Sequence, residues 1–591
     1  MADHFRRWAP ALTIVASGLL MLVWTWRTWP DVLVDFGREL YVPWRLAHGE
    51  VLYRDVAYFN GPLSPYVNAL WFRLFGTSLL TLVVANLAIT AGIAWLLFGL
   101  LAEIGGRFAA TVAGVVFLTT FAFAELAGIG NYNFVCPYSH ELTHGVALAL
   151  VALACVARWQ RTGRRSAVVA AGVAVGLTFL TKPEVFLAAA PATAVGLALA
   201  RRFTWRALLD FVAAAVVPTI VAGLALAVAI GPGEALRGVL GAWPSVVRGD
   251  VASNEFYRSG MGVAHPMLSV AVIGWWTVAY VLLLGALAAA AFAAGTSGTR
   301  RWLMLGVAVV AGALFHLLAA RGAPAWLDAA RPLPIAIVLV GATVVRTPHA
   351  GALRLALVVF ALVLLAKMAL NVHLYQYGFA LAMPATLVAV VALVEWIPAW
   401  IARRGGTGGL FRIGALALLA GIVLGHLRYV DFWVARKVHR VARGADAFWT
   451  DDRGPAVART LDEIGRRIPA DASVAVFPEG VMLNYLARRP SPTPYVNFMP
   501  PELAVFGERT MLAALEARPP DWVVLVHKDT SEYGAPLFGR DYGRRVYAWV
   551  RRHYREVEVI GARPLRDDRF GLALLARADR VGPLCRRAEA D

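Results

Sequence analysis

The chain has 591 residues, of which 59% are apolar and only 16% are charged, and its mean hydropathy is +0.62. This composition excludes a soluble globular protein and indicates a bundle of membrane-spanning helices. The net charge of +18 would suggest a nucleic-acid partner for a soluble chain, but here the arginines lie in short loops that orient apolar helices. A nucleic-acid partner is therefore excluded. The three cysteines are too few and too scattered for a disulfide framework or a thiolate zinc site.

Apolar runs recur along the chain at lengths that suit a bilayer, since crossing about 30 Å of hydrocarbon takes about 20 residues. The first run follows Arg6 and Arg7, and the bulky residues at 26–30 offer no signal-peptide cleavage site, so a retained first helix is expected. The pattern predicts about thirteen spans, at 11–29, 78–102, 108–125, 141–157, 167–181, 184–200, 207–230, 268–295, 302–320, 332–346, 355–370, 379–398 and 413–427.

The positive-inside rule orients these spans with the N-terminus in the cytoplasm. The loops at 126–140 and 371–378, which fall on the outer side, carry no Lys or Arg. An odd number of spans then sends the C-terminus to the periplasmic or extracellular side. The loops assigned to the cytoplasm hold Arg107, Arg158, Arg161, Arg164, Arg165, Arg201, Arg202, Arg206, Arg300, Arg301, Arg346, Arg354, Arg403, Arg404 and Arg412.

Two domains are predicted. Residues 1–427 form a transmembrane domain with a long first outer loop at 31–77 and a second polar connection at 231–266. Residues 428–591 have ordinary soluble composition and form an outer-face α/β domain. Strands are predicted at 474–477, 522–527, 556–560 and 572–575, and helices at 455–468, 501–517 and 541–553. The turn Phe477-Pro478-Glu479-Gly480 follows the first of these strands, and Asn484, Tyr485, Arg488 and Arg489 come soon after it. Because α/β domains bind ligands at such strand ends, this region suggests an accessory role in acceptor binding.

The first outer loop opens with Asp35, Arg38 and Glu39 just beyond a membrane helix. On charge alone this is a helix cap, with Asp35 at the N-cap and Glu39 in the first turn. The following segment, 49–66, reads GEVLYRDVAYFNGPLSPY and is dense in aromatic, Gly and Pro residues, as in a rigid loop on a membrane surface.

This first helix, acidic outer loop and aromatic segment resemble the GT-C superfamily of membrane glycosyltransferases, which includes protein O-mannosyltransferases and lipid A aminoarabinose transferases. The segments TKPE at 181–184 and YQYGF at 375–379 fit the wider pattern. The resemblance covers residues 1–427. It implies a base in the first outer loop that deprotonates the acceptor as the acceptor attacks the sugar C1 of a polyprenyl-phosphate donor.

The resemblance assigns the base to Asp35, with Asp55 in reserve. Cations are needed on the leaving phosphate, and Lys182 at the outer membrane edge suits this role, although it could also be a snorkelling interfacial lysine. The other residues predicted to bind substrate or phosphate are Arg38, Glu39, Glu184, Arg258, Arg321, Tyr375 and Tyr377. Tyrosines at an interface are also frequent membrane anchors.

His140-Glu141-Leu142-Thr143-His144 matches the zinc-binding H-E-x-x-H pattern. No third ligand follows at the spacing of such proteases, because the next polar segment, 158–165, is basic and cytoplasmic. His140, Glu141 and His144 share one helix face near the membrane boundary and are expected to face the same outer cavity as Asp35. They could hold a divalent cation, contact the donor phosphate, or hydrogen-bond with the first loop.

The sequence therefore favours a transferase in the inner membrane of a bacterium. It would move a sugar from a polyprenyl-phosphate carrier to a lipid, glycan or protein acceptor on the outer face. The only cofactor considered is a divalent metal ion. The alternatives are an integral membrane zinc protease that uses residues 140–144 and a lipid or sugar transporter, which would usually show internal pseudo-symmetry that this chain lacks.

Overall fold

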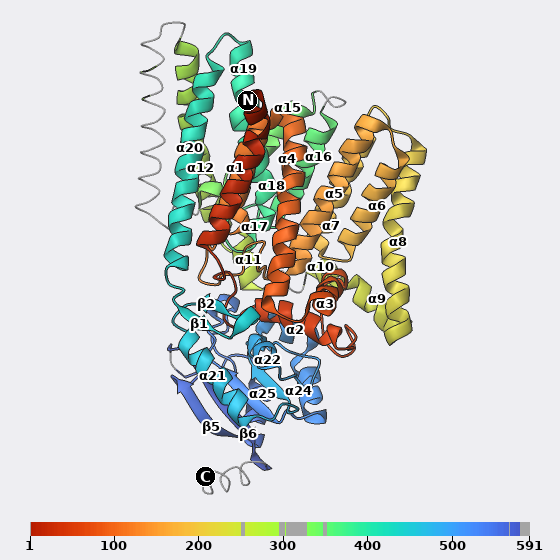
Figure 1. Cartoon of the computed structure of the whole chain (residues 1–591), viewed down its shortest axis with the longest axis vertical. Helices are drawn as coiled ribbons and strands as arrows, with labels where there is room; N and C mark the ends of the chain where they lie inside the picture. The colour runs from red at the N-terminus through yellow and green to blue at the C-terminus, as the bar shows by residue number, and fades with distance from the viewer. Residues whose placement is uncertain are drawn as a thin grey trace.

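Long apolar helices form the larger part of the molecule, and a sheet with its own helices is attached to one end of them (Figure 1). The computed structural model describes residues 2–249, 254–294, 302, 306, 328–346, 351–566 and 568–579. Apolar runs fold as helices because a helix satisfies its backbone hydrogen bonds within the segment, which lipid cannot do for it. The bundle helices are α1 (Ala2–Trp24), α4 (Leu79–Phe117), α5 (His140–Thr162), α6 (Arg165–Phe179), α7 (Pro183–Ala198), α8 (Trp205–Ile230), α12 (Pro266–Ala293), α15 (Leu333–Val344), α16 (Ala352–Ala366), α17 (Gly378–Leu381), α18 (Met383–Val391), α19 (Ile397–Arg403) and α20 (Gly408–Val434).

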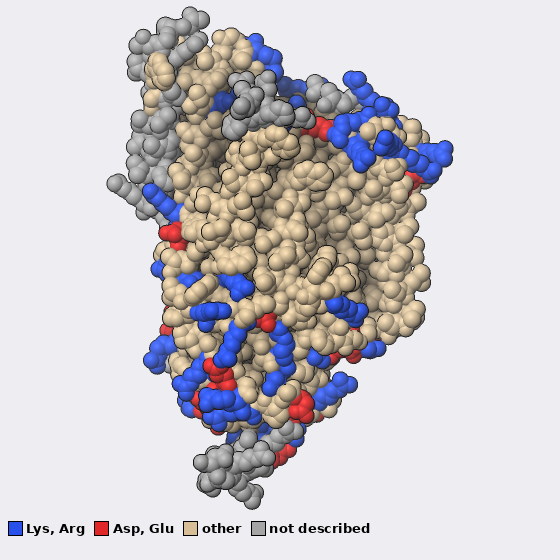
Figure 2. Space-filling view, in the orientation of Figure 1, with Lys and Arg blue, Asp and Glu red and all other residues tan. Residues whose placement is uncertain are grey.

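Among the described residues, six helical segments are long and apolar enough to cross a membrane. Their outer surfaces carry large apolar side chains such as Trp95 (76% exposed), Val228 (91%) and Trp275 (71%), which a lipid environment would cover. Figure 2 shows this as a broad uncharged band, with Lys and Arg gathered at the two ends of the molecule. The protein is a helical membrane protein.

Helices lie at the predicted spans wherever the structure describes them. The predicted pair 78–102 and 108–125 forms α4 and the π-helical turn η1 (Leu118–Ala122). The two halves are separated by a kink at Gly106, whose φ of 80° is outside the helical range. The predicted span 302–320 lies outside the described residues apart from Trp302 and Gly306, so the count of thirteen stays a prediction.

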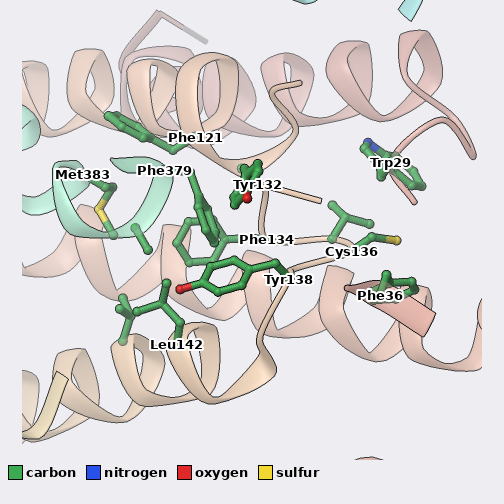
Figure 3. Close-up of a cluster of buried hydrophobic side chains, with 14 of the residues drawn as sticks. Trp29, Phe36, Phe121, Tyr132, Phe134, Cys136, Tyr138, Leu142, Phe379 and Met383 are labelled. Atoms are coloured by element: carbon green, nitrogen blue, oxygen red, sulfur yellow. The ribbon is translucent and has the colours of Figure 1, made fainter. Parts of the chain in front are cut away.

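Short helices and a buried loop lie between the bundle and the sheet. The helices are α2 (Phe36–Ala47), α3 (Leu63–Phe75), α9 (Pro232–Leu240), α10 (Trp243–Arg248) and α11 (Glu255–Met261). The loop between η1 and α5 passes through the protein interior. Its Phe134 and Tyr138 rings lie 5.3 and 6.2 Å from the Phe379 ring (Figure 3). This segment, predicted as a short outer loop, is therefore part of the core.

The C-terminal part of the chain is built on a four-stranded sheet in the order β3-β4-β6-β5. Strand β3 (Val474–Phe477) runs parallel to β4 (Trp522–Val526), whereas β6 (Gly571–Arg577) is antiparallel to both β4 and β5 (Tyr554–Gly561). A small antiparallel pair, β1 (His439–Val441) and β2 (Phe448–Thr450), precedes it. The four sheet strands overlap the four predicted segments. The helices of this part are α21 (Gly454–Arg467), α22 (Val481–Ala487), α23 (Pro500–Phe506), α24 (Glu508–Ala517) and α25 (Arg544–His553).

Both faces of this sheet are covered, which explains why β3 and β4 are buried at every position. Alternate side chains point to opposite faces of a strand. Val474 and Val476 belong to the core cluster that includes α21 and continues into the helical bundle. Ala475 and Phe477 belong to a separate cluster with α24 and α25. The sheet is thus the middle of three layers, and one of its faces is continuous with the bundle core.

The two parts approach each other most closely where α2 meets α22. A Cβ added to Gly37 would fall well inside van der Waals distance of the Met482 backbone, so only glycine permits this packing. Nearby, the buried Asp31 forms an ion pair with Arg453, with 2.5 Å between Oδ2 and a guanidinium nitrogen. These contacts hold residues 31–37 against the C-terminal part of the chain, at α22 and at the start of α21.

Candidate active site

Asp35 lies in a strained turn just before α2. Its φ and ψ are 55° and −65°, and the amide of Phe36 donates to the carbonyl of Val34 at 2.6 Å, which closes a three-residue γ-turn around Asp35. A positive φ at a non-glycine residue is costly and persists where the surroundings enforce it, often at functional sites. Asp35 holds the N-cap position, as the cap interpretation predicts, but its side chain accepts no capping hydrogen bond. The carboxylate is therefore not used to stabilise the helix.

The surroundings of Asp35 combine burial with charges of both signs. Burial, and next the carboxylate of Glu479, raise the pKa of Asp35 to about 7, against the opposing effects of Arg38 and Lys528. Glu479 and Lys528 come from the turns after β3 and β4 and form an ion pair with 3.4 Å between Nζ and Oε2. We refer to Asp35, Glu479 and Lys528 as the Asp35 cluster. A carboxyl group with a pKa near the working pH suits a general base.

Arg38 and Glu39 lie one turn into α2 and are both buried. The guanidinium of Arg38 donates to Glu39 Oε1 at 3.2 Å and to the carbonyl of Tyr138 at 3.0 Å, and it lies 5.7 Å from the Phe59 ring centre. Glu39 accepts from the backbone amide of His140 at 2.9 Å and lies 2.7 Å from His140 Nδ1. Glu39 thus fixes α2 against the start of α5 and holds Arg38 beside the Asp35 cluster.

The H-E-x-x-H residues are built into the core. His140 and Glu141 are fully buried, and their partners include side chains of the first outer loop. Tyr58 donates to Glu141 Oε1, Ser139 donates to Glu141 Oε2 at 2.7 Å, and Asn86 lies 3.0 Å from His140 Nε2. Together with Glu39 these side chains make up what we call the HELTH network: Glu39, Tyr58, Asn86, Ser139, His140 and Glu141. Its geometry matches the expected hydrogen bonding with the first loop, rather than side chains that face a cavity.

His144 belongs to the same helix face but is less fully engaged. Its Nδ1 lies 3.0 Å from Ser64 Oγ of the first loop, and its buried Nε2 has no hydrogen-bond partner among the described residues. Both ring nitrogens of His140 and both oxygens of Glu141 are already in use. Within the described part of the chain, no group of three or more His, Cys, Asp or Glu side chains could hold a metal ion. These residues do not fit a divalent cation, and no reaction step is assigned to one.

Lys182 lies at the start of α7, in a second polar group that faces the aromatic loop. Its Nζ donates to Tyr138 Oη at 2.9 Å and lies 3.7 Å from Glu184, and only 12% of its side chain is exposed. Lys367, at the end of α16, approaches the same Glu184 carboxylate at 2.8 Å and the Tyr377 ring at 5.3 Å. The buried position of Lys182 differs from the exposed position of a snorkelling lysine. Two lysines with one carboxylate leave a net positive charge beside the tyrosines.

Three tyrosines pack together beside this lysine pair. The rings of Tyr132, Tyr138 and Tyr377 lie 5.0 to 6.1 Å from one another. Burial raises the pKa values of Tyr132 and Tyr138, and the negative charge of Asp35 raises both further. Lys182, Glu184, Tyr138 and Tyr377 therefore form one group in contact, on which Asp35 acts electrostatically.

Other residues predicted for the site lie apart from these contacts. Asp55 pairs with the neighbouring Arg54 at 2.8 Å and accepts from the amide of Val51, in a partly exposed turn. Tyr375 packs its ring against His373 at 4.3 Å. Arg258 is exposed on α11. Arg321 lies outside the described residues.

Lys367 and Lys528 lie among the candidate site residues but were not predicted from the sequence. For each of the two lysines, the sequence contained a feature that could have identified it. Lys367 is a charged residue at the end of an apolar span, where ionisable groups are expensive unless they have a role. Lys528 is two residues past the end of β4, which is the parallel neighbour of β3. Ligands of α/β sheets bind at such strand ends.

No protein-family model and no curated protein sequence matches the chain. Among solved structures it is similar to ArnT from Cupriavidus metallidurans bound to undecaprenyl phosphate, with a TM-score of 0.46 and 14% identity over 96% of this chain and 98% of that one. It is also similar to the Archaeoglobus fulgidus oligosaccharyltransferase tethered with an acceptor peptide, with a TM-score of 0.49 and 14% identity over 88% of this chain and 69% of that one. Substrate and mechanism have to be inferred from the side chains of the site itself.

Proposed function

We propose that the protein is a GT-C-type glycosyltransferase of the bacterial cytoplasmic membrane. It takes a sugar from a polyprenyl-phosphate carrier and transfers it to an acceptor on the outer face. The observation that carries the proposal is Asp35: a carboxylate in a strained turn, free of any capping role, with a pKa raised to about 7. Asp35 is the residue that the family resemblance assigns as the base.

The reaction is an inverting displacement. The acceptor oxygen forms a bond to the sugar C1 while the bond from C1 to the phosphate oxygen breaks, and the acceptor proton passes to the carboxylate of Asp35. The polyprenyl phosphate leaves with the bonding electron pair and gains negative charge. Arg38, Lys182 and Lys367 supply cations for that charge, and such stabilisation is strong where water is scarce.

The arrangement also explains why a membrane protein would perform this chemistry. A polyprenyl chain is an apolar ligand that the lipid-facing helices can accommodate, while its phosphate needs polar partners at the bundle end. Lys182 and Lys367 begin or end their helices at that end, beside the tyrosine rings. The C-terminal sheet then covers the site from the side where the acceptor would approach.

The test is sugar transfer by purified protein. Radiolabelled polyprenyl-phosphate sugars are incubated with membrane extract and either wild type, Asp35→Asn or Asp471→Asn, the last being a matched change at an exposed aspartate of the sheet region. We expect label to pass to an acceptor with wild type and Asp471→Asn. Equal transfer by Asp35→Asn would refute the assignment of the base, and no transfer from any polyprenyl-phosphate sugar would refute the function.

A further inference from the structure

A small cavity opens where the sheet meets the first outer loop. Its volume is about 260 Å³. Leu33 and Val34, directly before Asp35, form one wall, and residues from the turns after β3 and β4 form the other. Among solved proteins, ligand sites for drug-sized molecules run from roughly 300 to 1,000 Å³. This cavity therefore has room for one small group rather than a lipid or a long peptide.

The chemistry of the lining is mixed. Glu479, Asp529 and Asp568 bring carboxylates, Lys528 and Arg453 bring cations, and Phe570 offers an aromatic face. A purely anionic or purely apolar ligand would leave part of this lining unsatisfied. A sugar ring matches it, because each hydroxyl both donates and accepts hydrogen bonds and the C–H face of the ring packs on an aromatic side chain.

Glu479 is poised to bind such a group. It is 5% exposed, and its Oε2 accepts no hydrogen bond from the described residues, although Lys528 lies 3.4 Å away as an ion-pair partner. A buried carboxylate oxygen without a hydrogen bond is costly, and a ligand hydroxyl would remove that cost. Lys528 holds the carboxylate in place without saturating it.

We propose that this cavity binds one sugar ring of the acceptor, with Glu479 accepting a hydrogen bond from a ring hydroxyl. Leu33 and Val34, which line the cavity, directly precede Asp35 in the chain, so the bound sugar is next to the proposed base. The acceptor role rests on the proposed glycosyl transfer, whereas sugar binding in the cavity does not. The acceptor is accordingly a glycan, and the C-terminal region completes the active site.

Binding is measured by saturation-transfer NMR on the full-length protein in a detergent without a sugar headgroup. The probes are glucose, mannose, galactose, arabinose and N-acetylglucosamine. We expect at least one to bind wild type, and Glu479→Gln to bind it at least about tenfold more weakly, the loss of a hydrogen bond to a charged group. Glu516→Gln, on the exposed face of α24, is the matched control and should equal wild type.

A second variant, Asp568→Asn, tests the cavity in case Glu479→Gln does not fold. Asp568 is exposed at the cavity rim, so its substitution should not disturb folding. It should weaken binding about two- to fivefold with an unchanged melting temperature. The cavity assignment is overturned if no probe binds, or if Glu479→Gln and Asp568→Asn both bind like wild type. If sugar is transferred but no probe binds, the proposed function is supported and the cavity assignment is refuted. If a probe binds but no sugar is transferred, the cavity assignment is supported and the proposed function is refuted.

The source of the glycan is read from the transfer assay. Label that enters the organic phase identifies a lipid-linked glycan, and label in an aqueous polysaccharide identifies a free one. Both support the proposal because both present a sugar ring. Label that enters only unglycosylated protein contradicts it.

Discussion

The HELTH network and the Asp35 cluster are both neighbours of Arg38, yet they differ in how their polar atoms are satisfied. In the HELTH network every carboxylate oxygen and ring nitrogen described above has a hydrogen-bond partner. In the Asp35 cluster, Asp35 caps nothing, its backbone is strained, and an oxygen of Glu479 accepts no hydrogen bond from the described residues. A saturated buried network stabilises one conformation, whereas unsatisfied groups retain capacity to bind a ligand.

The largest effects are expected when the stability and transfer rate of Glu39→Gln are compared with those of Asp35→Asn. Removing the Glu39 charge leaves Arg38 buried without its hydrogen-bonded counter-charge, which should lower the free energy of unfolding by about 3–5 kcal/mol. Asp35→Asn removes a carboxylate with no capping bond, so the melting temperature should not fall, while transfer should drop by about 10²–10⁴-fold. Melting curves and initial rates on the same preparations measure both effects.

If Glu39→Gln abolished transfer per folded molecule while leaving the melting temperature unchanged, the HELTH network would be catalytic and the comparison would be wrong.

Lys182→Met should have the next largest effect. It removes a cation that donates to Tyr138 while keeping the length of the side chain. A charge-assisted contact with phosphate is worth about 1.5–3 kcal/mol, so transfer efficiency should fall roughly 10- to 100-fold, mainly through the donor. Titrating the polyprenyl-phosphate donor at fixed acceptor measures this. Lys437→Met cannot serve as its control because Lys437 is buried against Glu125, so the exposed Arg258→Met is used instead.

The pH dependence should follow Asp35. Because its pKa is raised to about 7, the base form predominates only above that pH, and the transfer rate should fall about tenfold for each pH unit below it. Stability changes in the opposite sense. Between the ordinary aspartate pKa of 3.8 and about 7 the native state holds a proton that the unfolded chain has released. The contribution of Asp35 to the free energy of unfolding therefore decreases as pH rises through this window and is constant above it.

Glu479→Gln sharpens this test, since it removes the neighbouring negative charge and should move the midpoint of the rate profile to lower pH. An unchanged midpoint of the rate profile would show that the charge of Glu479 does not influence the pKa of Asp35.

The smallest effect is expected for Asp55→Asn. Asp55 is partly exposed and pairs with an adjacent arginine, a type of contact that contributes little. Transfer should stay within about twofold of wild type. A large loss in the same radiolabel assay would move the base from Asp35 to Asp55.

Local pattern was sufficient to predict many individual elements. Apolar runs predicted helices such as α5 and α8 because the period and length of a membrane helix are written in consecutive residues. The strands β3 and β4 could be predicted for the same reason, as short β-branched runs buried on both faces. Asp35 could be proposed from its place after the first helix together with the family resemblance.

Only the tertiary structure decided what the polar residues do. The H-E-x-x-H pattern looks catalytic in sequence, but side chains brought in from the first loop, including Glu39 and Tyr58, saturate it. Conversely, Glu479 and Lys528 are more than 440 residues from Asp35 in the chain, and the close packing at Gly37 brings them to it. Hydrogen-bond saturation and electrostatic environment depend on neighbours distant in sequence, and on the strength of these neighbours we propose Asp35, rather than the H-E-x-x-H segment, as the reactive group.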